Sequence, residues 1–245
     1  MGHLYYSLSP EVVAFSTRRR GGVSKGAYST FNANPFCGDA PEDVMQNRRL
    51  LASELGLDSQ QLVIPRQVHG ISVAMVDAPS APDGVDAVVT QTPGLCVCVS
   101  TADCIPVLLF DPVARAVAAI HAGWRGTVAD IVGNTVSFMQ QHCGTSPADL
   151  FAVIGPGIGI KAFEVGDEVY DAFHDARFPM ENIAQKEKKW HLDLWKANEW
   201  LLRRTGVENI HVAGICTYQH QEEFFSARRL GIHSGRILNG IFIKK

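Results

Sequence analysis

The stretch that decides the fold is residues 95–126, which read LCVCVSTADCIPVLLFDPVARAVAAIHAGWRG. It contains three apolar runs of strand length, Leu95–Ser100, Pro106–Phe110 and Ala116–His121. Short apolar runs that are bounded by turn residues are typical of β-strands. The stretch therefore predicts the β-rich centre of the fold.

Similar runs recur on both sides of this centre. Further strands are predicted at Val12–Ser16, Leu62–Pro65, Ser72–Asp77, Ala87–Thr90, Leu150–Ile154, Ile210–Ile215 and Ile237–Ile243. Amphipathic stretches predict helices at Pro41–Leu55, Thr127–His142, Gly166–Phe173 and Asp193–Arg204. Because the strands gather between residues 62 and 121 instead of alternating strictly with helices, we expect an α/β fold with a mixed sheet.

The ends of the predicted helices carry residues that favour particular backbone conformations. Pro41 suits a first helical turn, whereas Gly56 and Gly144 suit the left-handed position directly after a helix. Thr127, with Asp130 three residues later, predicts the N-cap of the helix that follows.

The composition is that of an ordinary globular protein. The 245 residues are 46% hydrophobic and 19% charged, with a formal net charge of −3. No linker or repeat divides the chain, so residues 1–245 are predicted to form a single domain. No apolar stretch approaches the ~18 residues that predict a membrane span, and the N-terminus lacks the pattern of a signal peptide.

The distribution of charged residues and of cysteines argues against a nucleic-acid-binding protein and against a disulfide-bonded one. The basic clusters Arg18–Arg20 and Lys186–Lys189 are short, which favours solvated surfaces over a nucleic-acid patch. The six cysteines do not resemble a disulfide framework, and four of them are predicted to be reduced structural residues: Cys96, Cys98, Cys143 and Cys216. We therefore expect a cytoplasmic protein without nucleic-acid or membrane partners.

Three short segments place reactive side chains beside turns at strand ends. They are Arg66–Gly70, Ser100–Pro106 and His121–Gly126. Catalytic and binding residues favour such loops on a rigid scaffold. The segments suggest a common site that contains His69, Cys104 and His121.

These three residue types allow two kinds of chemistry. One thiolate and two imidazoles suit a zinc ion with a fourth position left for water or substrate. Cys104 and a histidine could instead form a nucleophile–base pair without metal. The separations of 35 and 17 residues match no local zinc pattern, so the spacing leaves both alternatives open.

The segment after His121 also suits an anion. Gly123 and Gly126 allow close backbone approach, and the following helix N-terminus offers free N–H groups that Arg125 would supplement. A second glycine-rich turn, Ile154–Gly159, fits neither a P-loop nor a Rossmann motif.

Several motifs along the chain resemble the YfiH family, the bacterial laccase-domain proteins also labelled multicopper polyphenol oxidases. The resemblance runs nearly end to end, and the most specific pair is Thr101-Ala102-Asp103-Cys104 followed by His121-Ala122-Gly123-Trp124-Arg125-Gly126. The other matching segments are Ser16–Arg18, Gly21–Ser24, Asn47-Arg48, Gln67–Gly70, Ile154–Pro156, Phe163–Gly166, Cys216-Thr217 and Phe225–Arg229. The chain departs from many members at Lys161-Ala162, where they carry cysteine, and at Ala227, where tyrosine is commoner.

The resemblance implies a fold, a metal and an activity. The fold would be a single-domain mixed-sheet α/β sandwich of the YfiH type, which is similar to cytotoxic necrotizing factor, in a monomer or homodimer. Zinc would be held by His69, Cys104 and His121, with copper as the alternative metal. The activity would be phosphorolysis of adenosine, inosine and methylthioadenosine, together with deamination of adenosine.

Further site residues follow from the same resemblance. Phosphorolysis needs a phosphate site, for which Arg48, Arg125 and Arg228 are candidates. Gln67 is a candidate for substrate binding. Asp103, beside the thiolate, is a candidate for orienting a ligand or for proton transfer, and a role in forming the turn is equally consistent with it.

Three rival functions remain at this point. A multicopper oxidase is poorly supported, because no two of the nine histidines form a His-x-His pair. A Cys–His hydrolase with Cys104 as nucleophile and His121 or His69 as base would fit an amidase that edits peptidoglycan precursors. A non-enzymatic zinc-binding module is the third.

Overall fold

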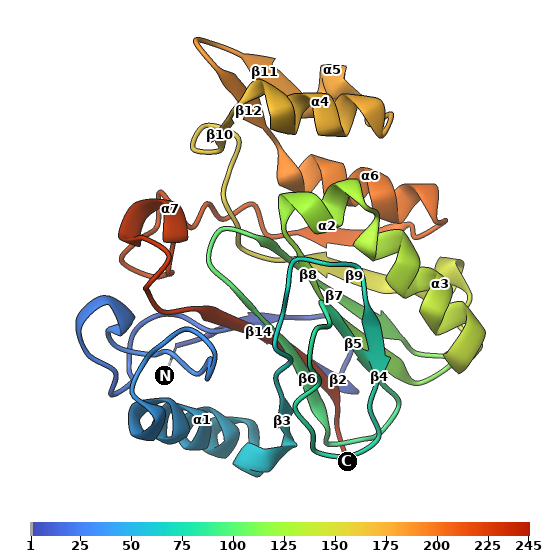
Figure 1. Ribbon diagram of the computed structural model, residues 1–245. Helices are drawn as coiled ribbons and strands as arrows, with labels where there is room; N and C mark the ends of the chain where they lie inside the picture. Colours follow the sequence, from blue (N-terminus) through green and yellow to red (C-terminus); the bar gives the residue numbers. More distant parts are fainter. Residues whose placement is uncertain (1) are drawn as a thin grey trace.

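The computed structural model describes residues 2–245 and contains two large β-sheets that pack face to face (Figure 1). Helix α1 (Pro41–Leu55) covers the outer face of one sheet. Helices α3 (Ile131–Cys143) and α6 (Leu194–Arg204) cover the outer face of the other. The layers are therefore helix, sheet, sheet and helices, which confirms the predicted mixed α/β class.

The first sheet has five strands in the order β1-β2-β14-β6-β3. Strand β14 at its centre pairs antiparallel with β2 and β6, whereas β3 runs parallel to β6. The last strand of the chain thus lies between the N-terminal strands and the centre of the fold. The strand bounds are β1 (Leu4–Tyr6), β2 (Val12–Ser16), β3 (Leu62–Val63), β6 (Cys96–Thr101) and β14 (Ile237–Ile243).

The second sheet has six strands in the order β13-β9-β7-β8-β5-β4. Its inner strands pair antiparallel, while each edge strand runs parallel to its neighbour. The bounds are β4 (Val73–Met75), β5 (Ala87–Thr90), β7 (Ile105–Asp111), β8 (Ala116–Ala122), β9 (Phe151–Ile154) and β13 (Asn209–Val212). Every strand predicted from the sequence is present, with bounds that differ by a few residues at most.

Alternating side chains of the central strands fill two different cores. On β7, Val107 and Leu109 pack towards the helices, whereas Leu108 and Phe110 pack between the two sheets. On β6, Val97 faces the other sheet and its neighbours face α1. Since both faces of these strands are buried, their sequences are almost continuously apolar.

The sequence predicts a helix over Thr127–His142, and the predicted start of this helix is wrong. The structure has a short helix α2 (Trp124–Val128), a break, and then α3. Asp130, at a φ of 62°, caps α3 by accepting a hydrogen bond from Gly133 N at 2.9 Å. Thr127 is no N-cap: its hydroxyl donates to Gly123 O at 3.0 Å inside α2. A left-handed residue separates the two helices, and asparagine or aspartate tolerates that conformation best.

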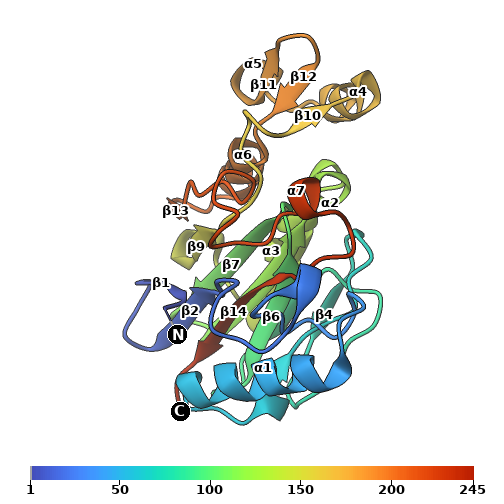
Figure 2. The same cartoon turned by 90° about the vertical axis from the view of Figure 1, so that its left-hand side faces the viewer.

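A small three-stranded sheet, in the order β10-β12-β11, stands apart from the two large sheets (Figure 2). It consists of β10 (Glu164–Val165), β11 (Ala184–Lys186) and β12 (Trp190–Leu192), with α4 (Asp167–Asp175) and α5 (Met180–Ile183) beside it. Of this unit, only α4 is predicted from the sequence. The remaining elements are α7 (Ala227–Leu230) and the 3₁₀ helices Gly26–Tyr28, Ser59–Gln61 and Pro147–Asp149.

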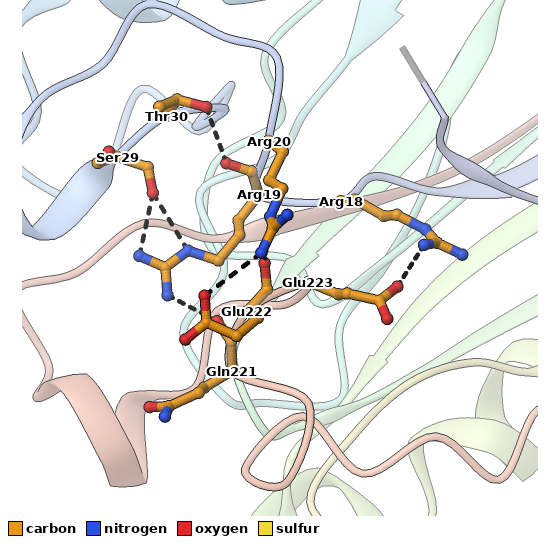
Figure 3. A network of polar contacts seen from close by, with 8 residues as sticks. All are labelled: Arg18, Arg19, Arg20, Ser29, Thr30, Gln221, Glu222 and Glu223. Atoms are coloured by element: carbon orange, nitrogen blue, oxygen red, sulfur yellow. Dashed lines mark hydrogen bonds and ion pairs between the residues drawn. The ribbon is translucent and has the colours of Figure 1, made fainter.

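The basic segment Arg18–Arg20 lies against the acidic segment Gln221–Glu223 (Figure 3). Arg18 pairs with Glu223, and Arg20 Nη2 lies 3.3 Å from the Glu222 carboxylate. Arg19 donates to the carbonyls of Gln221 and Ser29 and stacks over Phe225 at 4.8 Å. Arg18 and Arg20 are thus paired with acids, and the contacts of all three arginines tie the loop before α7 to the N-terminal region.

All six cysteines are free in the described part of the chain, as predicted. Within residues 2–245, no helix combines the length and apolar character needed to span a membrane.

Replacing the cap of α3 tests the break between α2 and α3. We expect Asp130→Ala to lower the free energy of unfolding by about 2 kcal/mol, because it removes a cap and places alanine in a left-handed conformation. Asp130→Asn keeps both features and loses only the ion pair with Arg204, so its loss should be under about 1 kcal/mol. Urea unfolding measures both; equal losses would contradict this account of the cap.

Candidate functional site

The predicted reactive residues meet at a cavity of about 610 Å³. His69 comes from the loop between β3 and β4, Cys104 from the turn between β6 and β7, and His121 from the end of β8. Their ligand atoms all lie within 4.8 Å of one another. The structure thus brings together three side chains that are far apart in the sequence.

The donor set suits one metal ion. Cys104 Sγ lies 3.9 Å from His69 Nε2, and the two imidazole rings are 4.7 Å apart at an angle of 77°. A Cβ at Gly123 would lie 3.0 Å from His69 and 3.1 Å from Cys104, so any larger residue here would push against both side chains of the cluster. One thiolate and two imidazoles are ligands that zinc and copper both accept. The residues could therefore hold a metal ion.

Asp86 contacts both histidine-bearing segments of this cluster. Its carboxylate is fully buried and lies 2.8 Å from His121 Nδ1. It also accepts hydrogen bonds from the backbone N–H groups of Val68, His69 and Gly70 at 3.2, 2.9 and 2.7 Å. Because an ionised carboxylate can only accept, Nδ1 of His121 carries a proton, and Nε2 is the ring nitrogen that can bind a metal once it loses its own proton.

The loop that carries His69 takes an unusual backbone conformation. His69 has a φ of 61°, in the left-handed region that non-glycine residues rarely occupy. Successive N–H groups around such a residue form a concave anion-binding site, which the Asp86 carboxylate fills here. One buried carboxylate thus offsets the cost of the strained loop and orients both histidines.

The electrostatics of the cluster favour an ion pair in the metal-free protein. Burial works to raise the pKa of Cys104, but the imidazoles of His121 and His69 outweigh it and lower this pKa to about 6. Burial works to lower the pKa of His121, yet the Cys104 thiolate and Asp86 raise it to about 9. The pKa of Asp86 is lowered despite its burial, mainly by the hydrogen bond with His121. Cys104 is thereby prepared as a thiolate, the form that binds metal or acts as a nucleophile.

Asp103 lines the cavity but its carboxylate is already in use. One oxygen accepts from Thr217 Oγ1 and the other from Arg228 N, both at 2.7 Å. The residue has a φ of 87°, so it also forms the turn that presents Cys104. Asp103 therefore fixes the position of Cys104, and its hydrogen bonds connect the turn of Cys104 to the start of α7.

Gln67 is similarly occupied. Its side-chain amide donates to Ser100 O at 2.9 Å and accepts from Ser100 N at 2.7 Å. It lines the cavity, and it fastens the loop of His69 to strand β6.

The three predicted phosphate-binding arginines lie in different places. Arg228 lines the cavity. Arg48 lies on α1, where its guanidinium donates to the carbonyls of Leu62 and Ser59. Arg125 is exposed on α2 and stacks over Trp124 at 4.3 Å. Neither Arg48 nor Arg125 is among the described residues that line the cavity.

The sequence argument missed four residues that shape this site. They are Asp86, Arg236, Phe36 and Phe163, of which the last three line the cavity. A signal existed for Asp86, because it directly precedes the apolar run Ala87–Thr90 and a carboxylate at the start of a buried strand needs partners.

The fold and the site define an α/β protein with a candidate centre for one metal ion. The chain belongs to the family described as "Multi-copper polyphenol oxidoreductase laccase", whose model matches residues 13–244. This confirms the resemblance to the YfiH family, since proteins named YfiH are among the relatives and among the similar solved structures.

Curated relatives cover nearly the whole chain. A purine nucleoside phosphorylase of Bacteroides thetaiotaomicron is 48% identical over 98% of this chain and 96% of its own length. Adenosine deaminase RL5, from an unknown prokaryotic organism, is 41% identical over 95% of this chain and 94% of its own length.

Solved structures agree with the fold. The crystal structure of a hypothetical protein YfiH from Bacillus licheniformis superposes with a TM-score of 0.92 at 30% identity, covering 98% of this chain and 99% of that one. YlmD from Geobacillus stearothermophilus gives a TM-score of 0.92 at 33% identity, covering 96% of this chain and 93% of that one.

Removing the negative charge of Asp86 should weaken metal binding. We expect Asp86→Asn to lower the affinity for Zn²⁺ about 10-fold to 100-fold, because the amide no longer orients His121 and the His69 loop as the carboxylate does. Competition with a chromophoric chelator measures the affinity. The control is Asp111→Asn, which changes another fully buried carboxylate that accepts two backbone N–H groups in the turn after β7. Equal losses in the two variants would contradict the role of Asp86.

The thiolate of Cys104 can be titrated in metal-free protein. Because only the thiolate reacts with iodoacetamide, we expect the alkylation rate of Cys104 to rise as the pH increases through about 6. Cys37 is an internal control, since burial raises the pKa of its thiol and its reaction should begin only at alkaline pH. Mass spectrometry of each peptide gives both profiles, and coincident profiles would refute the ion pair.

Proposed function

We propose that this protein is a zinc-dependent purine nucleoside phosphorylase that acts on adenosine, inosine and methylthioadenosine and also deaminates adenosine. The observation that carries the proposal is the His69–Cys104–His121 cluster in a cavity of about 610 Å³, within the size range of small-molecule sites. Relatives named for these two activities cover almost all of the chain.

Zinc fits the cluster better than a multicopper centre does. Among the described residues, one group of three or more His, Cys, Asp and Glu side chains has the spacing to hold a metal, and it offers three ligand atoms. Several copper ions would need several such groups. A zinc ion at this cluster would supply Lewis-acid chemistry, by polarising a substrate group or by making a water molecule more acidic.

The phosphorylase reaction places clear demands on the cavity. A phosphate oxygen forms a bond to C1′ of the ribose, the bond between C1′ and the purine nitrogen breaks, and the purine leaves with a proton. Phe163, almost fully buried, and Phe36, half-exposed, line the cavity and offer apolar surface to a purine. Arg228, which also lines the cavity, carries a positive charge that is suited to the phosphate.

Deamination uses the same cavity with a different nucleophile. Water adds to C6 of adenine and ammonia leaves, so a proton has to be moved from the water to the leaving amine. Cys104 and His121 would hold the metal in this reaction, and Asp86 keeps His121 in one orientation through the contact at 2.8 Å. These residues are our candidates for holding the reacting groups.

One observation favours a second candidate, a Cys–His hydrolase. Cys104 contacts His121, and His121 contacts Asp86. This is the arrangement of a nucleophile, a base and a residue that orients the base. In that case the thiolate would attack the amide carbon of a peptidoglycan precursor without any metal, the amine would leave with a proton from His121, and water would then cleave the thioester. Metal dependence separates the two candidates, because bound zinc would occupy the thiolate. A non-enzymatic zinc module would bind zinc and turn over neither substrate.

Several expectations from the sequence remain proposals. They are a single domain over residues 1–245, a monomeric or homodimeric state, a cytoplasmic location, and the absence of nucleic-acid and membrane partners. The paired arginines of Arg18–Arg20 support the absence of a nucleic-acid partner.

Product analysis with a cysteine variant tests the proposed function. Zinc-loaded protein should convert adenosine to adenine and ribose 1-phosphate only when phosphate is present, and should form inosine in either case. We expect Cys104→Ala to lose both its zinc and at least about 100-fold of each activity, because one of three ligands is gone. Cys143→Ala, at a half-buried position on α3, should change neither.

Two outcomes would contradict this proposal. Absence of product from adenosine and inosine in zinc-loaded protein would reject the nucleoside activity. Amide hydrolysis by zinc-free protein, lost in Cys104→Ala, would establish the hydrolase instead.

A further inference from the structure

Two arginines, Arg228 and Arg236, line the cavity that contains the His69–Cys104–His121 cluster. Arg228 belongs to α7 and Arg236 directly precedes β14. The sequence argument did not single out Arg236. What each guanidinium can still bind follows from the hydrogen bonds it already makes.

Arg228 is held by backbone carbonyls. Its Nη1 donates to Ala162 O and Glu164 O at 3.3 and 3.2 Å, and its Nη2 donates to Glu164 O at 3.2 Å. A guanidinium has five N–H groups, so the Nε–H and one Nη2–H remain. These two lie on the same edge of the guanidinium plane, which is the edge that binds an oxyanion with two parallel hydrogen bonds.

Arg236 is held in the same manner. Its Nη1 donates to the carbonyls of Ser234 and Gly235 at 2.6 and 3.1 Å, and its Nη2 donates to Ile232 O at 2.8 Å. Its backbone N–H donates to Asn32 Oδ1 at 3.1 Å. Again the Nε–H and one Nη2–H are without a partner among residues 2–245. Neither guanidinium has to give up rotamer freedom when it binds a ligand, because both are already fixed.

The charge of the two arginines is not cancelled within the cavity. Among the described residues that line it, Asp103 is the one acid, and both of its oxygens already accept hydrogen bonds from Thr217 and Arg228 N. The Glu164 carboxylate, which interacts electrostatically with Arg228, is paired with Lys189 at 2.8 Å and is not among the described residues that line the cavity. Two fixed guanidinium groups therefore present unused donors and positive charge to the cavity.

We infer that Arg228 and Arg236 together form an anion subsite that binds inorganic phosphate, the second substrate of the phosphorylase reaction. The inference rests on the proposed function for its role in turnover, but the binding site itself does not depend on that function. It assigns phosphate to the wall made by α7 and the segment before β14. Arg48 and Arg125 take no part, because neither is among the described residues that line the cavity.

Titration with inorganic phosphate tests the subsite directly. Isothermal titration of zinc-loaded protein without nucleoside should show one phosphate site, and Arg236→Gln and Arg228→Gln should each weaken it about 10-fold or more. Arg236→Lys keeps the charge but not the paired donors, so its affinity should lie between those of the parent protein and Arg236→Gln. Thermal unfolding checks that each variant is folded.

The matched control is Arg229→Gln. Arg229 is the neighbour of Arg228 on α7, but its guanidinium contacts Gln221 and stacks over Tyr218 at 4.5 Å. This variant should bind phosphate as the parent protein does. An equal loss in Arg229→Gln, no phosphate binding by the parent protein, or unchanged binding in a folded Arg236→Gln would each overturn the inference.

Kinetics then connect the subsite to turnover. In Arg236→Gln the KM for phosphate should rise about 10-fold or more, and phosphorolysis should fall further than phosphate-independent deamination of adenosine. An equal fall in both reactions would assign Arg236 to the nucleoside and overturn the inference. If the parent protein binds phosphate at this site but cleaves no nucleoside, the subsite stands and the proposed function fails.

Discussion

The buried carboxylate of Asp86 is the interaction on which the site depends. It accepts from three successive backbone N–H groups around His69 and lies within hydrogen-bonding distance of the imidazole of His121. Left alone, such a carboxylate would be costly to bury, and the loop of His69 would be strained. The carboxylate and the loop therefore stabilise each other, and they fix two neighbouring histidines close to Cys104.

The rest of the fold brings the other wall of the cavity to this pair. The carboxylate of Asp103 joins the turn of Cys104 to Thr217 and to the start of α7. The paired segments Arg18–Arg20 and Gln221–Glu223 hold the loop before α7 from the opposite side. These contacts join distant parts of the chain around the cavity.

Features of the fold and of the site could be predicted from the sequence where they depend on residues that are close together along the chain. The strands around residues 95–121 were predictable, since burial on both faces leaves a continuous apolar pattern. A common site of His69, Cys104 and His121 was suggested by their positions at strand ends, but their assignment as zinc ligands came from the family resemblance, because separations of 35 and 17 residues have no local signature. The start of α3 at Asp130 was missed, as were the short strands beside α4, because neither follows from hydrophobic periodicity. Arg236 was missed because its role depends on the carbonyls that surround it.

X-ray absorption at the zinc edge of zinc-loaded protein tests the central claim most directly. The account predicts one sulfur at about 2.3 Å and two imidazole nitrogens at about 2.0–2.1 Å, with one further light ligand. Cys104→Ser should remove the sulfur and keep the imidazoles. A first shell without sulfur, or one with two or more sulfurs, would contradict a centre built from His69, Cys104 and His121.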